Sequence, residues 1–277
     1  MPEPLSSSAI RQFRNDGFTP AVRVMSEKEA VDYRNRLQAV ETVIGELKGG
    51  YRLKCHLLYK WIADLIRSPA IVQNVQALLG PNLMCWGTDL WLKEANSDQF
   101  VSWHQDSQYW GIDGDQLLTA WIALSPATVE SGCMRMIPGS HLEDALAHED
   151  TYHNDNMLTR GQTICEGIDE SKAVNIEVGT GEAVFFTYRI AHASHPNRSD
   201  DRRLGIAIRY VSTVSKQLKS DWDSATMICG EDLHGNFVHE PEPSRDFDPV
   251  AVEFHRKSNE NYRKILYSDT DWTSHRT

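Results

Sequence analysis

The sequence predicts a mainly β protein, a jelly-roll or barrel with helices packed outside it. The first 80 residues have helical periodicity, and the chain changes at Asn82 to short strand-like segments separated by Gly, Pro, Asp and Ser. Several short, regularly punctuated strands are typical of such folds. A length of 277 residues suits one large domain. We expect a single domain over 1–277, with a helical lead-in over 1–80, a jelly-roll core over 82–213 and a C-terminal loop and helix over 214–277.

Three helices are expected in the lead-in and one near the end of the chain. Ser26 and Glu29 form a capping-box pattern ahead of a periodic stretch that reaches Leu47. The segments KWIADLIRS and PAIVQNVQALLG carry apolar residues at three- and four-residue spacing, and Pro69 separates them. Residues 248–266 are the candidate closing helix.

Seven strand-like segments follow Asn82. We interpret the polar stretches 140–173 and 214–247 as long loops, which on a β scaffold often act as lids over binding sites. The expected strands are NLMCWGTDLWLK (82–93), QFVSWHQ (99–105), LLTAWIALS (117–125), CMRMI (133–137), AVNIEV (173–178), EAVFFTY (182–188) and RRLGIAIRYVST (202–213).

Composition argues against several classes of protein. A net charge of −11 without a basic cluster disfavours nucleic acid and anionic membranes as partners. No apolar run approaches the ~20 residues of a membrane helix, and the N-terminus has no signal-peptide core. The five cysteines lack zinc-binding spacing, so we interpret them as reduced thiols of a cytoplasmic protein. A small molecule is the expected partner, and the oligomeric state is left open.

The pattern His-x-Asp occurs three times, and only one copy has the context of a metal site. His104 and Asp106 end a short aromatic-rich segment, where residues i and i+2 of an extended chain point to the same face. Two ligands can then reach one metal. The copies at His148 and His153 lie in a polar stretch without alternation. We therefore interpret those two as parts of a solvated loop.

A third ligand is best sought in residues 188–211, where His192 follows one expected strand and Arg203 opens another. Two His with one carboxylate are the ligand set of non-haem Fe(II) oxygenases, which leave the other positions open. A 2-oxo acid would chelate such an iron, and its far carboxylate needs a bidentate cation such as Arg203. Gly205 and Ala207 share the face of Arg203 and would leave room for that ligand. The alternative for Arg203 is a structural ion pair with a neighbouring Asp.

Taken together, these segments resemble the phytanoyl-CoA dioxygenase family of Fe(II)/2-oxoglutarate oxygenases, from the FRNDGF opening to about Val211. The resemblance implies a double-stranded β-helix, a cupin-like jelly-roll. The motifs that carry it are GPNLM (80–84), WHQD (103–106), TAWIAL (119–124), ESGCMRMIPGSH (130–141) and HASHPNRSDDRR (192–203).

The resemblance assigns roles to individual residues. It implies iron ligands at His104, Asp106 and His192, and it selects Arg203, eleven residues past His192, over Arg202 as the residue that binds 2-oxoglutarate. It also implies that Ser194 binds the 2-oxoglutarate carboxylate and that Trp121 and Met84 line the co-substrate pocket. His195 is an additional histidine in this motif and is interpreted as a loop residue.

The sequence constrains the substrate-binding residues less than it constrains the iron ligands. Lys93 has counterparts in relatives, and if it points as they do, Gly87, Asp89 and Trp91 share its face by alternation. Gln108, Tyr109 and Trp110 follow the iron pair and are candidates for the mouth of the site. An inward Asp89 among aromatic rings would suit a cationic substrate, whereas Arg209, which alternates with Arg203, would suit an anionic one. Plain packing of the aromatic residues is an equal alternative.

The resulting hypothesis is an oxygenase that uses Fe(II), 2-oxoglutarate and O2 to hydroxylate a C–H bond of a small metabolite or natural-product intermediate. Asp106 disfavours halogenation, because halogenating relatives replace this carboxylate. Desaturation or ring closure with the same cofactors, and a non-catalytic metal-binding jelly-roll protein, are the alternatives. A zinc hydrolase is disfavoured because no glutamate base lies at a fixed spacing from the histidines, as it does in HExxH.

Overall fold

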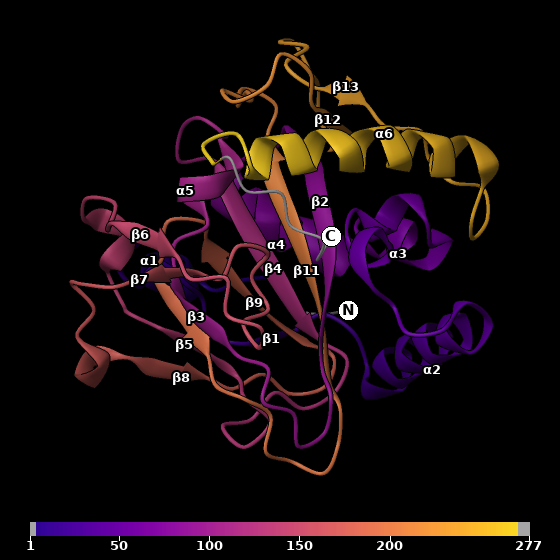
Figure 1. The fold of residues 1–277 in the computed structure, drawn as a ribbon. Helices are drawn as coiled ribbons and strands as arrows, with labels where there is room; N and C mark the ends of the chain where they lie inside the picture. Colours follow the sequence, from indigo (N-terminus) through magenta and orange to yellow (C-terminus); the bar gives the residue numbers. More distant parts are fainter. Residues whose placement is uncertain (1–3, 271–277) are drawn as a thin grey trace.

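Two facing β-sheets form the centre of the fold, which the computed structural model describes over residues 4–270 (Figure 1). Apart from the parallel pair β12–β13, neighbouring strands run antiparallel. The large sheet has the order β1 (Val22–Arg23), β9 (Glu182–Thr187), β4 (Leu117–Ala123), β11 (Arg203–Ser212), β2 (Leu83–Lys93), β12 (Ser224–Cys229) and β13 (Val238–His239). The small sheet has the order β3 (Val101–His104), β10 (His192–Ser194), β5 (Met134–Met136) and β8 (Val174–Ile176).

Helices cover the outer face of the large sheet, as the sequence led us to expect. Figure 1 shows α2 and α3 on the side away from β3, β5 and β8, and α6 across one end of the sheet. Ser26 and Glu29 form the expected capping box of α2. The helices are α1 (Ser7–Asp16), α2 (Glu27–Ile44), α3 (Lys60–Leu65), α4 (Pro69–Leu79), α5 (Ser107–Trp110) and α6 (Pro249–Leu266). Short 3₁₀ turns occur at η1 (Gly49–Arg52), η2 (Cys55–Leu57), η3 (Ser140–Leu142) and η4 (Glu170–Lys172).

Strand alternation on β11 divides the interior into two compartments. Leu204, Ile206 and Ile208 point outward and pack against the helices, whereas Ala207 packs between the sheets with residues of β4, β5 and β9. The outer compartment holds no charged residue of β11, whereas the inner one carries Arg203 and Arg209. The inner face of the large sheet therefore carries the polar and charged side chains that could form a functional site.

A β-bulge in β2 changes which of its residues point inward. Arg209 pairs with Gly87 and Tyr210 with Cys85, so Trp86 is an extra residue in β2. Beyond the bulge, Asp89 faces the interior, while before it Met84 does. Simple alternation would have put these two residues on opposite faces.

Short strands occur within both segments interpreted as loops, which corrects that interpretation. Residues 140–173 contain the two-stranded sheet β6 (His148–Asp150) and β7 (Gln162–Ile164). Residues 214–247 contain β12, which pairs with β2, and β13. The large sheet therefore extends past the expected 82–213 core on both sides, since β1 also belongs to it. β6, β7 and β13 have only two or three residues, and β12 (SATMIC) does not alternate regularly between polar and apolar residues, so none shows the pattern by which strands are recognised.

Within residues 4–270, no helix combines the length and the apolar character needed to cross a membrane.

Candidate active site

The pairing of β3 with β10 brings the three proposed ligands together. His104 lies directly opposite His192 in this antiparallel pair, and the centroids of the two rings are 4.0 Å apart. Asp106 follows β3 at the start of the one-turn helix α5. One potential ligand atom from each of the three side chains lies within 4.8 Å of the others. Among residues 4–270, this is the cluster of His, Cys, Asp or Glu side chains with the spacing of a metal site.

Backbone carbonyls fix the orientation of both histidine rings. His104 Nδ1 lies 3.0 Å from the carbonyl oxygen of Ser102, and His192 Nδ1 lies 3.0 Å from that of Ile190. A carbonyl accepts, so each Nδ1 carries the hydrogen and each Nε2 keeps a lone pair. His104 Nε2 then lies 3.4 Å from Asp106 Oδ1, with two acceptors facing each other. A cation between them would satisfy both, so the donor set fits a divalent metal.

The protonation states of the cluster also suit metal binding. Burial, followed by the neighbouring His104, lowers the pKa of His192 to about 4. Burial alone would raise the pKa of Asp106, but the interactions with the neighbouring His104 and His192 outweigh it and lower that pKa. At neutral pH the cluster therefore has a neutral imidazole at His192 and an ionised carboxylate, the forms that ligate metals.

Gln105, between two of the proposed ligands, is held from three sides. Its backbone N–H donates to His148 Nε2 at 2.9 Å, and its side-chain amide bonds to Arg189 O and the Leu146 N–H at 2.8 and 2.9 Å. His148 in turn lies 2.8 Å from Leu146 O through Nδ1. The second His-x-Asp pattern is thus a support for the first rather than a solvated loop. The signal was hidden because the contact spans 43 residues of sequence.

The third His-x-Asp pattern, at His153 and Asp155, is exposed. Asp150, from the second, forms an ion pair with the buried Arg160.

Two basic side chains near the cluster, those of Lys93 and Arg203, are buried. Lys93 Nζ donates to Ser194 Oγ at 2.7 Å and also to the carbonyl of His195. Arg203 donates to the carbonyl of Gly132 and lies 5.5 Å from the centroid of the Trp121 ring. The Nε of Arg203 has no hydrogen-bond partner, and no carboxylate within residues 4–270 forms an ion pair with either cation. The unpaired guanidinium of Arg203, with the amine of Lys93 nearby, suits a carboxylate ligand.

The ion pairs that could have occupied Arg203 are made by other residues. Asp201 pairs with Arg34 at 2.6 Å, and Arg202 pairs with Glu41 at 2.6 Å on the outer side. This arrangement agrees with the choice of Arg203 over Arg202 as the inward arginine.

The space beside Gly205 is used differently from our expectation. A Cβ at Gly205 would lie 2.2 Å from the Trp121 indole, so the missing side chain makes room for this ring. The indole in turn lies against the guanidinium of Arg203. Gly205 therefore accommodates a neighbouring protein group rather than the ligand itself.

Burial changes the protonation of Lys93. Burial, and then the nearby Arg203, lowers the pKa of Lys93 to about 6. The amine is therefore largely neutral at pH 7 while no anion is present, and an arriving carboxylate would favour its charged form.

The residues expected around the site divide between two cavities. The inner one is lined by the three ligands together with Ser194, Trp121 and Arg203, and the outer one by Asp89, Trp91, Tyr109 and Trp110. Trp91, His104, Asp106 and Arg209 line both. Two expected residues line neither cavity. Met84 is fully buried in an apolar cluster beneath α6, and Gln108 contacts Lys219 through its carbonyl.

Asp89 and Arg209, which suggested opposite substrate charges, form an ion pair with each other. Both are nearly buried, and the Arg209 guanidinium also lies 4.4 Å from the centroid of the Trp110 ring. Gly87 lies beside this guanidinium, with a Cβ position 3.4 Å from its Nη1. The two charges therefore neutralise each other, and neither is a free partner for a substrate.

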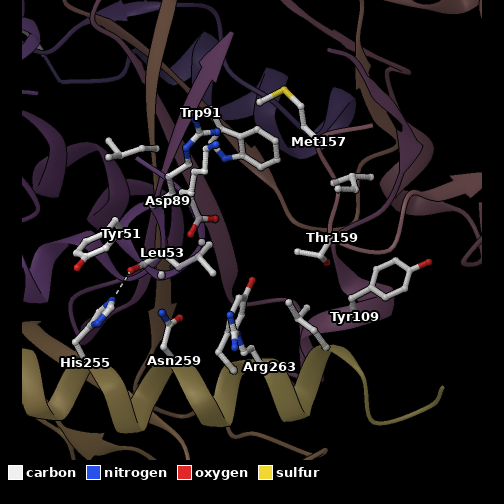
Figure 2. Close-up of a pocket in the computed structure, with 18 of the residues that line it drawn as sticks. Tyr51, Leu53, Asp89, Trp91, Tyr109, Met157, Thr159, His255, Asn259 and Arg263 are labelled. Carbon is white, nitrogen blue, oxygen red and sulfur yellow. Dashed lines mark hydrogen bonds between the residues drawn. The ribbon is translucent and has the colours of Figure 1, made fainter. Parts of the chain in front are cut away.

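The C-terminal helix is the part of the site that sequence reasoning did not anticipate. Figure 2 shows His255, Asn259 and Arg263 projecting from α6 into the outer cavity, opposite Asp89 and Trp91 of β2. Their spacing of four residues is visible in the sequence, but nothing in it indicates which surface the helix covers.

A double-stranded β-helix that joins two histidines and an aspartate at one end defines the class of Fe(II)- and 2-oxoglutarate-dependent oxygenases. The chain belongs to the phytanoyl-CoA dioxygenase family, whose sequence profile matches residues 13–205. Fe(II), 2-oxoglutarate and O2 are therefore its cofactor and co-substrates, as expected from the sequence.

Three similar proteins illustrate the range of this class. An L-proline trans-4-hydroxylase of Streptomyces griseoviridis is 27% identical over 75% of this chain and 86% of its own length. The non-haem monooxygenase ThoJ is 31% identical, with a TM-score of 0.83 over 94% of this chain and 98% of ThoJ, and it has also been solved as a nickel complex. The carbocyclase SnoK from nogalamycin biosynthesis is 25% identical, with a TM-score of 0.63 over 77% of this chain and 86% of SnoK. The chain spans about half the length of the curated phytanoyl-CoA dioxygenases it matches.

Proposed function

We propose that this protein hydroxylates an unactivated C–H bond of a small metabolite or natural-product intermediate, with release of succinate and CO2. The observation that carries the proposal is the position of the His104–Asp106–His192 cluster at the junction of two cavities. One cavity contains the unpaired guanidinium of Arg203, and the other is wide. Such a junction separates a co-substrate from the bond to be oxidised.

Each proposed ligand has a definite role. His104, Asp106 and His192 hold Fe(II), with the rings oriented by their Nδ1–H bonds to backbone carbonyls. When bound, the iron activates O2 with 2-oxoglutarate as the source of electrons. The protein fixes the ligand geometry and keeps the reacting bond close to the open coordination positions.

The inner cavity binds 2-oxoglutarate. Arg203 forms the charge-assisted pair with the far carboxylate, Lys93 and Ser194 add donors, and Trp121 keeps the guanidinium in place. The site excludes water because these residues are almost fully buried. A dry environment strengthens the pairing of the carboxylate with the two cations.

The outer cavity binds the substrate. Its volume of about 1050 Å³ exceeds what a single free amino acid needs and suits a larger natural-product intermediate. Trp91, Tyr109 and Trp110 supply apolar walls next to the proposed ligands. Because Asp106 provides the third ligand, the proposed reaction is hydroxylation rather than halogenation.

Release of succinate from 2-oxoglutarate tests this function. We expect His104→Ala and Asp106→Ala to abolish Fe(II)-dependent succinate formation and to lower iron affinity, while His153→Ala, in the exposed pattern, retains both. Arg203→Ala should weaken 2-oxoglutarate binding by ~2–5 kcal/mol, because it leaves a carboxylate buried without its partner.

Two results would contradict the proposal. Wild-type turnover by either ligand variant with iron supplied would exclude the ligand assignment, and unchanged 2-oxoglutarate affinity of Arg203→Ala would exclude its role. Complete absence of succinate formation by the wild-type protein, tested over a metabolite panel, would favour the non-catalytic alternative. Mass analysis of the product separates hydroxylation from desaturation or ring closure.

A further inference from the structure

The outer cavity is lined by two arginines whose charge no ion pair neutralises among residues 4–270. Arg52 and Arg263 line it, and no carboxylate within residues 4–270 forms an ion pair with either guanidinium. Arg52 Nε donates to the carbonyl of Leu47. The remaining charges of the lining are neutralised in the pairs Asp89–Arg209, Glu46–Lys48 and Arg256–Glu253, and Glu260 pairs with Lys264. Asp106 belongs to the iron site.

Arg263 is placed to contact a ligand in the cavity. It lies on the same face of α6 as His255 and Asn259, at a spacing of four residues, and Figure 2 shows all three projecting toward β2. Four residues correspond to about 6 Å along a helix. The Arg263 side chain is exposed, so its guanidinium is hydrated and accessible until a ligand arrives.

Asn259, one turn before Arg263, has an acceptor without a partner. Its side chain lines the cavity and is 8% exposed, and its Oδ1 is buried with no hydrogen bond in the described part of the chain. His255 offers no such group, since its Nε2 donates to the carbonyl of Leu53 at 2.8 Å. A buried carbonyl oxygen without a donor costs free energy, which a ligand N–H or O–H would recover.

We propose that the substrate carries an acidic group, a carboxylate or a phosphate, that binds Arg263, and a hydrogen-bond donor about one helical turn away that binds Asn259 Oδ1. The acidic end then lies against α6, and the opposite end reaches Trp91 and the iron site. This assignment rests on the proposed function only for the direction in which the substrate points. The anion site itself depends on α6 and not on the iron.

Binding of matched probes tests the inference. Phenylbutyrate, phenylpropyl phosphate, phenylbutanamide and phenylbutylamine present different end groups on a similar phenylalkyl chain. They would be titrated into the full-length protein with Fe(II) and 2-oxoglutarate under nitrogen, with the change in tryptophan fluorescence as the readout, since Trp91 and Trp110 line the cavity. We expect the carboxylate or the phosphate to bind at least about tenfold more tightly than the amide, because charge-assisted hydrogen bonds to arginine are the stronger kind. The amine should bind most weakly, and the tighter of the two acids identifies the group.

The variants localise the effect. Arg263→Gln should reduce the preference for the acid over the amide to within about twofold, since it removes the charge that distinguishes the two probes. Arg256→Gln is the matched control, because Arg256 lies on the same helix and is paired with Glu253 at 2.7 Å, and it should keep the full preference. Asn259→Leu should weaken phenylbutanamide, which carries an N–H donor, more than phenylbutyrate.

Equal binding of acid and amine by the wild-type protein, no measurable binding of either acid, or an unchanged preference in Arg263→Gln would each overturn the inference. Succinate release without added substrate is measured in parallel. If the wild-type protein showed no succinate release but kept the acid preference, the proposed function would fail and the anion site would stand.

Discussion

Asp89 and Arg209 pair with each other, although the sequence, which located both correctly in the interior, suggested that each would contact the substrate. Alternation from Lys93 and Arg203 placed both in the interior, and both line the cavities. Their mutual ion pair depends on the pairing of β2 with β11. Asp89 lies opposite Ala207, and Arg209 is two residues beyond Ala207 on the same face of β11. Among residues 4–270, the arginines that line the outer cavity without an ion pair are Arg52 and Arg263.

The lowered pKa of Lys93 predicts that the protein takes up a proton when 2-oxoglutarate binds. Because its pKa is lowered to about 6 before 2-oxoglutarate binds, and the carboxylate raises it, binding should take up a proton above pH 6. The affinity for 2-oxoglutarate is then highest below the free pKa and falls as pH rises toward the raised value. Calorimetry of the Fe(II)-loaded protein under nitrogen, in buffers of different ionisation enthalpy, should give an uptake approaching about one proton at pH 7.5.

The control for this prediction is Lys93→Met, which should bind 2-oxoglutarate more weakly and without that proton. A wild-type binding enthalpy that does not vary with the buffer would show that Lys93 is already charged or does not contact the co-substrate.

At the scale of elements, the site depends on small irregularities between regular strands. Because Trp86 is an extra residue in β2, Met84 before the bulge and Asp89 after it both point inward. The short β6–β7 hairpin brings His148 to the backbone of Gln105. The sequence identified most of the long strands because their alternation is strong. It did not identify β1, β6, β7, β10, β12 or β13, which have two to six residues and are formed by tertiary pairing.

The β6 contact predicts a role for His148 in positioning the ligands. His148→Phe removes the acceptor of the Gln105 N–H and should lower iron affinity by about 10–100-fold, as is typical for groups that orient metal ligands. His148→Gln, which can still accept that hydrogen bond, should recover much of the affinity. The measurement is an equilibrium titration of Fe(II) under nitrogen, followed by the Km for 2-oxoglutarate.

His153→Phe is the control, since His153 is exposed and lies five residues further along the same segment. Iron affinity in His148→Phe equal to that of the wild-type protein would mean that β6 does not support the ligand loop.

At the scale of the whole molecule, a buried polar network fastens the C-terminal region to the sheet. The Glu240 carboxylate accepts from Lys54 Nζ and bonds to His56 Nε2, both at 2.7 Å, and Ser224 and Thr226 also donate to it at 2.8 and 2.7 Å. These groups come from η2, β12 and the segment that follows β13. The network therefore fixes the chain that leads into α6, which forms one wall of the outer cavity.

Glu240→Gln should destabilise the protein by ~3–5 kcal/mol at pH 7, because it leaves Lys54 buried without a countercharge. Burial alone would raise the pKa of Glu240, but Lys54 and His56 outweigh it and hold that pKa far below its usual value. A lowered carboxylate pKa stabilises the fold above the unfolded-state pKa, roughly 4.3, and this contribution is lost as pH falls below it. The difference between the variant and the wild-type protein should therefore shrink from pH 5 toward pH 3.

Urea unfolding across this pH range measures the difference, and Glu253→Gln, an exposed position on α6, should match the wild-type protein within ~0.5 kcal/mol. A constant difference between Glu240→Gln and the wild-type protein at all pH values would contradict the linkage.

The sequence by itself determined the family, the mainly β fold with helices outside, and the residues that the structure brings together as His104, Asp106, His192 and Arg203. It could do so because these features are local: alternation, capping and motif spacing are fixed by residues close together in the chain. Only the tertiary structure decided that Asp89 neutralises Arg209, that Trp121 fills the space at Gly205, and that α6 closes the outer cavity with Arg263. Those outcomes depend on contacts between distant segments, whose pairing, bulges and packing no local pattern encodes.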